Sequence, residues 1–454
     1  MEKTAKNNGR IIAIVVMFFI YGMISFVTNL AAPIGTIWGN QFEGNSVLGM
    51  MGNMMNFLAY LFMGIPAGKM LTNIGYKKTA LVAMAVGVVG LFAQYLSSFV
   101  GTDTIVGQFA SYVIPLNYII YLLGAFICGF CVCMLNTVVC PMLNLLGGGG
   151  NRGNQLLQFG GAINSLAGTL TPFFVGALIG QLSANTMMGD VSPLLIIGMG
   201  IFIVAFAILC FIPIQEPKAA KKANVKYAHS PWSFRHTMLG VVGIFFYVGI
   251  EIGIPGTLNF YLADQGENGA GVVGNASNNA GAIVAIYWLL MLVGRVLSGF
   301  ISGAVSTRKQ LTTVATVAIV LILFAIFIPK SATVAVPAFV YEGGAEVPIS
   351  AYLLVLCGLC TSIMWGGIFN LAVEGLGKYT EQASGIFMMM VVGGGVMPLI
   401  QNAIAGQIGY MGSYWLVIAM LAYLLFYGLI GSKNVNTDIP VDDVEEAADD
   451  ARNL

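Results

Sequence analysis

Long runs of apolar residues dominate the chain, and their length limits what it can fold into. A helix that crosses a bilayer needs about 20 consecutive apolar residues. The 454-residue sequence contains twelve such runs. They are predicted at residues 11–35, 47–71, 78–99, 113–143, 155–182, 192–214, 237–262, 277–303, 310–329, 349–374, 383–409 and 412–431. A chain with this many spanning segments is a polytopic membrane protein.

The composition supports helices as the spanning elements. Hydrophobic residues make up 58% of the chain and charged residues only 8%, which excludes a water-soluble protein. Strands of a membrane barrel would alternate polar and apolar residues, and these runs do not alternate. The 58 glycines suit helices that pack closely in a membrane. We therefore predict an all-α membrane protein.

The positions of the basic residues predict the orientation of the chain. Of the 19 lysines and arginines, only Lys330 falls in an odd-numbered loop, and Arg295 lies within the eighth span. Positive charge marks the cytoplasmic side of a membrane protein. Both termini and the central loop are therefore expected in the cytoplasm. The formal net charge of zero gives no reason to expect a nucleic-acid partner.

The two halves of the sequence repeat each other. Several small or helix-breaking residues recur after about half the chain length: Gly22 and Gly249, Gly68 and Gly299, Cys128 and Cys357, Pro172 and Pro398, Gly180 and Gly406. We predict two six-helix bundles at 1–214 and 236–433, a cytoplasmic linker at 215–235 and an acidic cytoplasmic tail at 434–454. Such a parallel repeat resembles the organisation of major facilitator transporters, whose substrate site lies between the halves.

The loop after the second span carries a motif. Residues 66–78 include Gly68, Gly75 and Lys77 and resemble the cytoplasmic signature of major facilitators. The acid and the arginine of that signature are replaced here by Thr72 and Asn73. The glycines permit a tight turn and close helix approach. We expect Gly68, Gly75 and Lys77 to serve gating or structure, without an ion-pair latch in this loop.

A narrower resemblance covers nearly the whole chain. Segments 21–33, 135–141, 164–166, 246–251, 368–377 and 391–398, supported by 287–295, resemble the fucose/galactose/glucose proton symporter family. The resemblance implies a twelve-helix major facilitator fold with two pseudo-symmetric six-helix bundles in a bacterial inner membrane. It also implies sugar transport by alternating access. The family carries coupling acids where this sequence has Asn29 and Asn136, so proton symport does not transfer directly.

One acid, Glu251, is predicted deep inside a span. An intramembrane charge is costly and usually marks function, and burial favours the neutral carboxyl that a proton carrier needs. One carboxylate with amide and backbone oxygens could instead hold sodium. Glu251 is our candidate for coupling to a proton or sodium ion; the alternative is a helix-joining glutamate. No other cofactor and no metal is expected, since the Cys128/Cys131 and Cys357/Cys360 pairs lack nearby histidines.

Amides and aromatic side chains in the spans are candidates for substrate contact. Amides offer donors and an acceptor to a neutral polyhydroxylated ligand, and aromatic rings stack on its C–H groups. Both kinds of side chain also simply pack helices together. The predicted substrate residues are Asn29, Asn136, Gln158, Asn164, Trp365, Asn370, Tyr287 and Trp288. Arg295 and Glu374, near cytoplasmic ends of spans, are expected to hold helix ends or a gate.

Together these features favour a cation-coupled importer of a neutral monosaccharide, a hexose or deoxyhexose such as glucose, galactose or fucose. A charged substrate would need a compensating charge that the predicted cavity lacks. The transport alternatives are a uniporter and a carrier of another neutral solute. A polytopic membrane enzyme is the alternative from a different class, but such chemistry usually needs paired carboxylates, histidines or a metal. A non-transporting sensor is the third possibility, although the polar tail is too short for an obvious output domain. The expected partners are the sugar, the coupling cation and the lipid bilayer, with the protein a monomer.

The charge distribution makes a testable topology prediction. Reporters placed after Gly101, Asn275 and Leu454 should report outside, outside and inside, because the basic residues flank the even-numbered loops and the termini. Paired phosphatase and fluorescent-protein fusions measure this directly. An outside position for Leu454 would contradict the assignment of sides.

Overall fold

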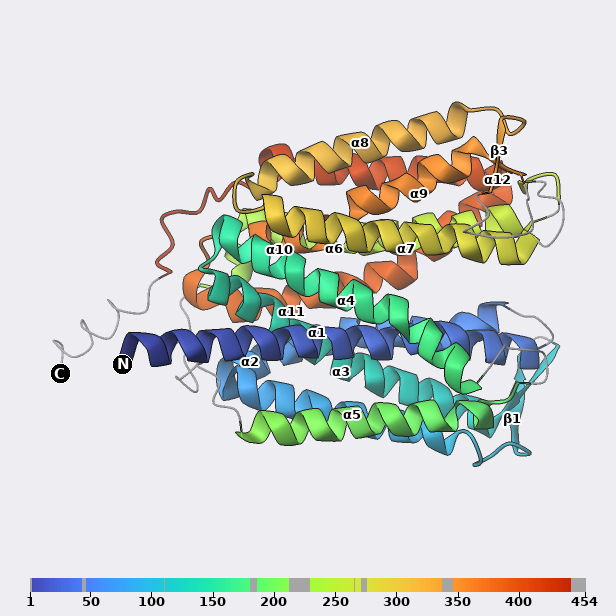
Figure 1. Cartoon of the computed structure of the whole chain (residues 1–454), viewed down its shortest axis with the longest axis horizontal. Coiled ribbons are helices and arrows are strands. Elements are labelled where there is room, and N and C mark those ends of the chain that lie inside the picture. The colour runs from blue at the N-terminus through green and yellow to red at the C-terminus, as the bar shows by residue number, and fades with distance from the viewer. Residues whose placement is uncertain are drawn as a thin grey trace.

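The computed structural model of the chain is a bundle of long helices that run roughly along one axis (Figure 1). It describes residues 2–42, 46–109, 111–179, 186–211, 229–264, 266–270, 276–336 and 346–441. The start of the first helix and the last described residues lie at one end, called the termini side below (Figure 1). Two short β-hairpins lie at the opposite end, called the hairpin side (Figure 1).

The N-terminal half forms one bundle, coloured blue to green in Figure 1. Its helices are α1 (Glu2–Gln41), α2 (Ser46–Leu96), α3 (Leu116–Gly147), α4 (Gly150–Ile179) and α5 (Ser192–Phe211), with a short turn η1 (Met188–Val191) before α5. Helix α2 is long enough to cross twice, and it reverses at Gly75, whose φ is 83°. Glycine adopts positive φ without a steric penalty, which explains its presence there. This bundle therefore has six spans.

The C-terminal half forms the second bundle, coloured yellow to red in Figure 1. Its elements are η3 (Pro231–Ser233), α6 (Arg235–Ala263), α7 (Ala276–Ile301), α8 (Thr307–Phe327), α9 (Ile349–Thr361), α10 (Met364–Ala372), η4 (Gly377–Tyr379), α11 (Thr380–Met389), η5 (Met390–Val392), α12 (Gly393–Phe426) and η6 (Tyr427–Gly431). Helices α9 and α10 make one broken span, and α12 reverses at Gly409. The described residues of this half form six spans as well, so the predicted all-α fold of two six-helix bundles is confirmed.

On the hairpin side, the observed boundaries of the elements differ from those predicted from the sequence. Strand β1 (Ile105–Phe109) pairs antiparallel with β2 (Tyr112–Pro115), and β3 (Thr333–Ala335) pairs with β4 (Glu346–Pro348). The predicted span at 113–143 begins three residues too early, because strand residues such as Val113 are as apolar as the helix that follows, and it ends four residues before the helix does. That helix begins at Leu116. Residues 212–228, with most of the predicted linker 215–235, and tail residues 442–454 lie outside the described ranges.

The two bundles meet most closely on the termini side. Gly64 and Gly68 of α2 lie against the backbone of Gly385 in α11, where an added side-chain carbon would collide with main-chain atoms. Small residues at this crossing let the helices approach to backbone contact. Beyond the reversal at Gly75, Lys77 donates to the carbonyl of Cys210 over 2.9 Å, which ties α2 to α5 within the N-terminal bundle.

One face of the first half of α4 carries polar side chains and closely packed glycine. Asn154, Gln158, Gly161 and Ser165 recur every three or four residues, so they share one side of the helix. This side packs against α7 and α10 of the other bundle. Around the break between α9 and α10, the carbonyls of Ser362 and Ile363 accept hydrogen bonds from side chains. These features place polar groups between two otherwise apolar bundles.

Candidate functional site

A cavity of about 440 Å³ lies between the two bundles. Helices α1, α2, α3 and α4 line it on one side, and α6, α7, α10 and η5 line it on the other. Its polar and aromatic lining residues are Tyr21, Ser25, Thr28, Asn29, Asn53, Phe57, Tyr60, Asn136, Asn164, Glu251, Asn259, Trp288, Arg295 and Trp365. The volume falls within the range of small-molecule sites.

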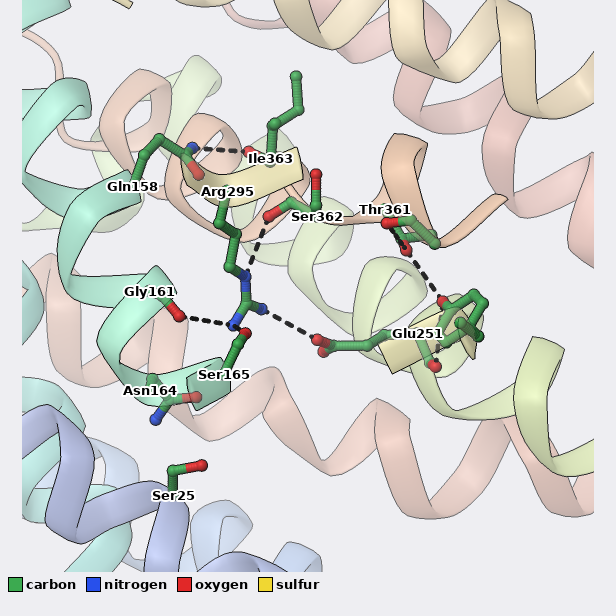
Figure 2. A network of polar contacts seen from close by, with 12 residues as sticks. Ser25, Gln158, Gly161, Asn164, Ser165, Glu251, Arg295, Thr361, Ser362 and Ile363 are labelled. Atoms are coloured by element: carbon green, nitrogen blue, oxygen red, sulfur yellow. Dashed lines mark hydrogen bonds and ion pairs between the residues drawn. The ribbon is translucent and has the colours of Figure 1, made fainter. Parts of the chain in front are cut away.

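An ion pair forms part of the cavity wall. The Arg295 Nη2 atom lies 3.2 Å from Glu251 Oε1, and the two side chains are only 9% and 14% exposed. Figure 2 shows the guanidinium between α4 and Glu251. Its Nε donates to the Ser362 carbonyl over 3.2 Å, and Nη1 donates to the Gly161 carbonyl and to Ser165 Oγ over 3.1 and 2.6 Å. Nearly all donors of Arg295 are therefore occupied.

The position of Arg295 corrects two sequence-based expectations. It was expected near the cytoplasmic end of its span, holding a helix end or a gate, and the cavity was expected to lack a charge that could compensate a charged substrate. The long side chain instead reaches sideways from α7 into the cavity wall, which counting residues along a helix does not reveal. The cavity still has no net charge, because Glu251 neutralises Arg295.

Three of the predicted amides line the cavity. The Nδ2 of Asn136 donates to Tyr60 over 2.8 Å, that of Asn164 donates to the Tyr21 carbonyl over 2.9 Å, and that of Asn29 donates to the Ser25 carbonyl over 2.8 Å. Within the described part of the chain, these contacts leave the amide oxygens without donors. An amide oxygen held this way is a rigid acceptor for a ligand hydroxyl.

The predicted aromatic residues separate into two groups. Trp365 and Trp288 line the cavity, and Trp365 packs with Tyr247 and Phe387. Tyr287 does not line it, which corrects its prediction as a substrate residue. Its hydroxyl lies 2.9 Å from Thr361 Oγ1 and 3.4 Å from the Glu251 carbonyl oxygen, and the side chain is fully buried. Tyr287 therefore supports the backbone that carries Glu251.

Gln158 and Asn370 were also predicted to bind substrate, and the structure places them elsewhere. Gln158 donates to the Ile363 carbonyl over 3.0 Å, and Asn370 accepts from Asn144 over 2.6 Å. Both contacts join the two bundles on the termini side and lie outside the cavity. The helical period predicts which face of a helix carries an amide. It does not predict which part of a neighbouring helix that amide lies beside.

These contacts belong to a gate, defined here as the polar contacts that join the bundles on the termini side. Besides the bonds of Gln158 and Asn370, Asn154 donates to Ser302 over 3.0 Å and Ser384 donates to the Thr137 carbonyl over 3.4 Å. These hydrogen bonds between the bundles, and those of Arg295, lie on this side of the cavity or at its wall. The cavity is thus closed toward the termini side.

The gate includes residues that sequence analysis missed. Glu381 of α11 is 3% exposed and accepts from Tyr76 of α2 over 3.4 Å. The signal was an acid at the start of a span, four residues before Gly385.

Glu374, expected to hold a helix end, lies 2.8 Å from Arg308, and the Arg308 guanidinium also donates to the Ser432 carbonyl. That pair is exposed and lies on the termini side.

The described residues contain no cluster of three or more histidine, cysteine or acidic side chains that could hold a metal ion. The cysteines are free, and all except Cys210 are buried among the helices. Cys128 and Cys357, the first members of the two Cys-x-x-Cys pairs, lie in α3 and α9, where they fill space between helices.

Residues 14–398 match the family model of the Major Facilitator Superfamily. The chain belongs to this superfamily. It is 30% identical to a glucose/galactose transporter of Brucella abortus over 94% of this chain and 96% of that protein. It is also 22% identical to the L-fucose-proton symporter of Escherichia coli, covering 82% and 81% of the two chains. These relatives confirm the resemblance to the fucose/galactose/glucose symporter family.

Solved structures show the same fold. A major facilitator transporter, FucP, in the outward conformation matches with a TM-score of 0.72 and 17% identity, over 93% of this chain and 100% of that one. The superfamily consists of transporters, so this membership decides against the hypothesis of a polytopic membrane enzyme.

The burial of the two ion pairs predicts different stability effects. Arg295→Met should destabilise the protein by about 3–5 kcal/mol, because it leaves the Glu251 carboxylate buried without a counter-ion. Arg308→Met removes a pair whose side chains are 36% and 45% exposed, so its cost should stay near or below about 1 kcal/mol. Thermal unfolding of the two purified variants compares these effects. Equal losses would show that the Arg295 pair is as well solvated as the surface pair.

Proposed function

We propose that the protein imports a neutral monosaccharide, a hexose or deoxyhexose, by alternating access of the central cavity. The observation that carries this proposal is the pairing of Arg295 with Glu251 in a cavity whose other lining residues are uncharged and include amides and aromatic rings. The names of the glucose/galactose and L-fucose relatives support the same substrate class.

The electrostatics of the cavity favour a neutral ligand. The N–H groups of Arg295 donate to Glu251, to the Ser362 carbonyl and to α4, so few remain to bind a carboxylate or phosphate. An anionic ligand would have to displace a buried ion pair, which is costly. The amide oxygens of Asn136 and Asn164 instead offer acceptors suited to hydroxyl groups.

The aromatic residues complete a site for a sugar. Trp365 from α10 and Trp288 from α7 both belong to the C-terminal half, whereas Asn136 and Asn164 belong to the N-terminal half. A pyranose ring between them would present hydroxyls to the amides and C–H groups to an indole ring. Contacts from both halves let one ligand influence how the halves move relative to each other.

The orientation follows from the charge distribution. We place both termini in the cytoplasm and the protein, as a monomer, in a bacterial inner membrane. The hairpin side then faces outward, and the closed gate faces the cytoplasm. The fold match to a transporter captured in an outward conformation is consistent with this placement.

Coupling to a cation is assigned to Glu251. Among the described residues that line the cavity, Asn29 and Asn136 stand where the family has acids and cannot titrate. The carboxyl of Glu251 lines the same cavity and can. It can take up a proton, or contribute to a sodium site together with amide and carbonyl oxygens. We favour the proton, since one relative is named a proton symporter. Uniport remains the second candidate, because both family positions for acids carry amides here.

The cavity amides should govern sugar affinity. Asn136→Ala and Asn164→Ala are each expected to weaken binding about fivefold or more, the equivalent of about 1 kcal/mol for a lost hydrogen bond. Calorimetry with glucose, galactose, fucose, glucuronate and an amino acid measures both affinity and selectivity. Tyr423→Phe is the control, because it loses a hydrogen bond to the Leu239 carbonyl outside the cavity. Preferential binding of glucuronate would contradict the neutral-ligand proposal.

Coupling is tested by sugar uptake into proteoliposomes under an imposed pH gradient and then a sodium gradient. The parent should accumulate sugar under one of them, and Glu251→Gln should lose that accumulation while still exchanging sugar down its own gradient. Glu374→Gln, which neutralises an exposed acid on the termini side, is the matched control and should behave like the parent.

Two results would change the assignment. Absence of accumulation under either gradient would make the protein a uniporter. Gradient-driven uptake by Glu251→Gln at the parental rate would make Glu251 a structural residue.

A further inference from the structure

The β1–β2 hairpin has an inner face that packs on the protein and an outer face that does not. The ring of Tyr112 lies 6.3 Å, between centroids, from that of Phe42, which directly follows α1. Side chains alternate along a strand, so the neighbouring Val113 points to the opposite face. Ile105 pairs with Pro115, which shares the face of Val113. Ile105 and Val113 therefore belong to the outer face.

This outer face is apolar and exposed. The side chains of Ile105 and Val113 are 68% and 49% exposed, and Val106 and Phe109 of the same hairpin are exposed as well. Residues 104–117 of the sequence include no charged side chain. Contact between this surface and water is unfavourable, and apolar side chains gathered on one exposed surface mark a site of interaction.

The base of the hairpin is fixed at the level where two membrane spans end. The Leu116 N–H donates to the Thr104 carbonyl over 2.7 Å, and the Asn117 N–H donates to the Gly101 carbonyl over 3.2 Å. Both donors lie in the first turn of α3, and α2 ends at Leu96. Figure 1 shows the hairpin at the end of the N-terminal bundle. A segment held at the ends of spanning helices lies at the depth of the lipid headgroups.

The exposed apolar surface of the flanking helices leads to the hairpin. On α3, Ile119 and Leu123 are four residues apart, share one face and are exposed. At the end of α2, the rings of Phe92, Tyr95 and Phe99 form a row with centroids 6.4 and 5.1 Å apart. Aromatic side chains are enriched at the boundary between membrane and water. The outer face of the hairpin therefore continues the surface that the spans present to lipid.

The corresponding hairpin of the second half has a different character. On β3–β4, the Thr333 hydroxyl donates to the Glu346 carboxylate over 2.8 Å. Just before β3, the Lys330 ammonium donates to the Glu267 carbonyl over 3.3 Å. Charged side chains of both signs favour water over lipid. The two hairpins follow the third span of each half, so the comparison isolates the apolar surface of β1–β2.

We propose that the outer face of the β1–β2 hairpin is a lipid-binding surface, which inserts into the boundary region of the leaflet on the hairpin side. Ile105 and Val113 contact the upper part of the acyl chains. The unpaired N–H and C=O groups at the strand edges stay among the headgroups, because hydrocarbon cannot satisfy them. The hairpin thus anchors the end of α3 to the leaflet. This proposal depends neither on the sugar nor on which side of the membrane the hairpin faces.

The test measures contact with lipid at one position on each hairpin. Val113→Cys and Val334→Cys are each made with the exposed Cys210 changed to serine, and each carries a thiol-attached fluorophore. The two valines are 49% and 46% exposed, so they are matched. The labelled proteins are placed in phosphatidylcholine nanodiscs with and without a nitroxide near the carbonyl end of the acyl chain.

The nitroxide lipid should quench the label at Val113→Cys about threefold more strongly than the label at Val334→Cys, because apolar faces at this boundary lie about 5–10 Å inside it. Iodide in the water should show the opposite order. A label at Val113→Cys that the nitroxide lipid quenches no more than the label at Val334→Cys would overturn the proposal.

A label at Val113→Cys that neither quencher reaches would also overturn it, because that result indicates a protein on this surface, such as a second copy of the chain. If Val113→Cys does not fold, as judged by its elution in size-exclusion chromatography, Ile105→Cys on the same face carries the label. The expected and contrary results are then the same.

Discussion

A cation buried between helices in a membrane needs a fixed counter-ion, and the pair of Arg295 and Glu251 meets that requirement at the centre of this protein. Much of the surrounding structure follows from it. Tyr287 binds the carbonyl of Glu251, the break between α9 and α10 supplies the Ser362 carbonyl, and α4 presents Gly161 where a larger residue would crowd the guanidinium. The charge is held by partners from both bundles, which makes it sensitive to how the bundles are arranged.

The gate, on the termini side of this pair, is built mainly from neutral groups. The superfamily signature after the second span lacks its acid and arginine, and Thr72 and Asn73 stand in their place. Amide and hydroxyl contacts such as Asn144 with Asn370 join the bundles instead, over close glycine packing at Gly385. Neutral hydrogen bonds exchange with water at little net cost. Such a gate can open and close without separating several ion pairs.

The acidic residue at the cavity, Glu251, lies in a different half of the chain from the acids of the family pattern. The two family positions for acids lie in the N-terminal half and carry Asn29 and Asn136 here, where they line the cavity as hydrogen-bonding groups. The carboxyl that remains at the cavity is on α6 in the C-terminal half. Proposed coupling therefore acts through α6 and α7, while the proposed sugar contacts of Asn136 and Asn164 stay on α3 and α4.

The sequence by itself determined the number of spans, the two-fold repeat and the membrane class, because apolar run length and spacing are local properties of the chain. It also identified Glu251, Asn29, Asn136, Asn164, Trp288 and Trp365, which line the cavity. It did not separate these from Gln158, Asn370 and Tyr287, because periodicity gives the face of a helix but not its depth beside a neighbour. Only the tertiary structure decided that Arg295 joins Glu251 to α4, since that depends on where a long side chain reaches once three helices from two bundles are packed together.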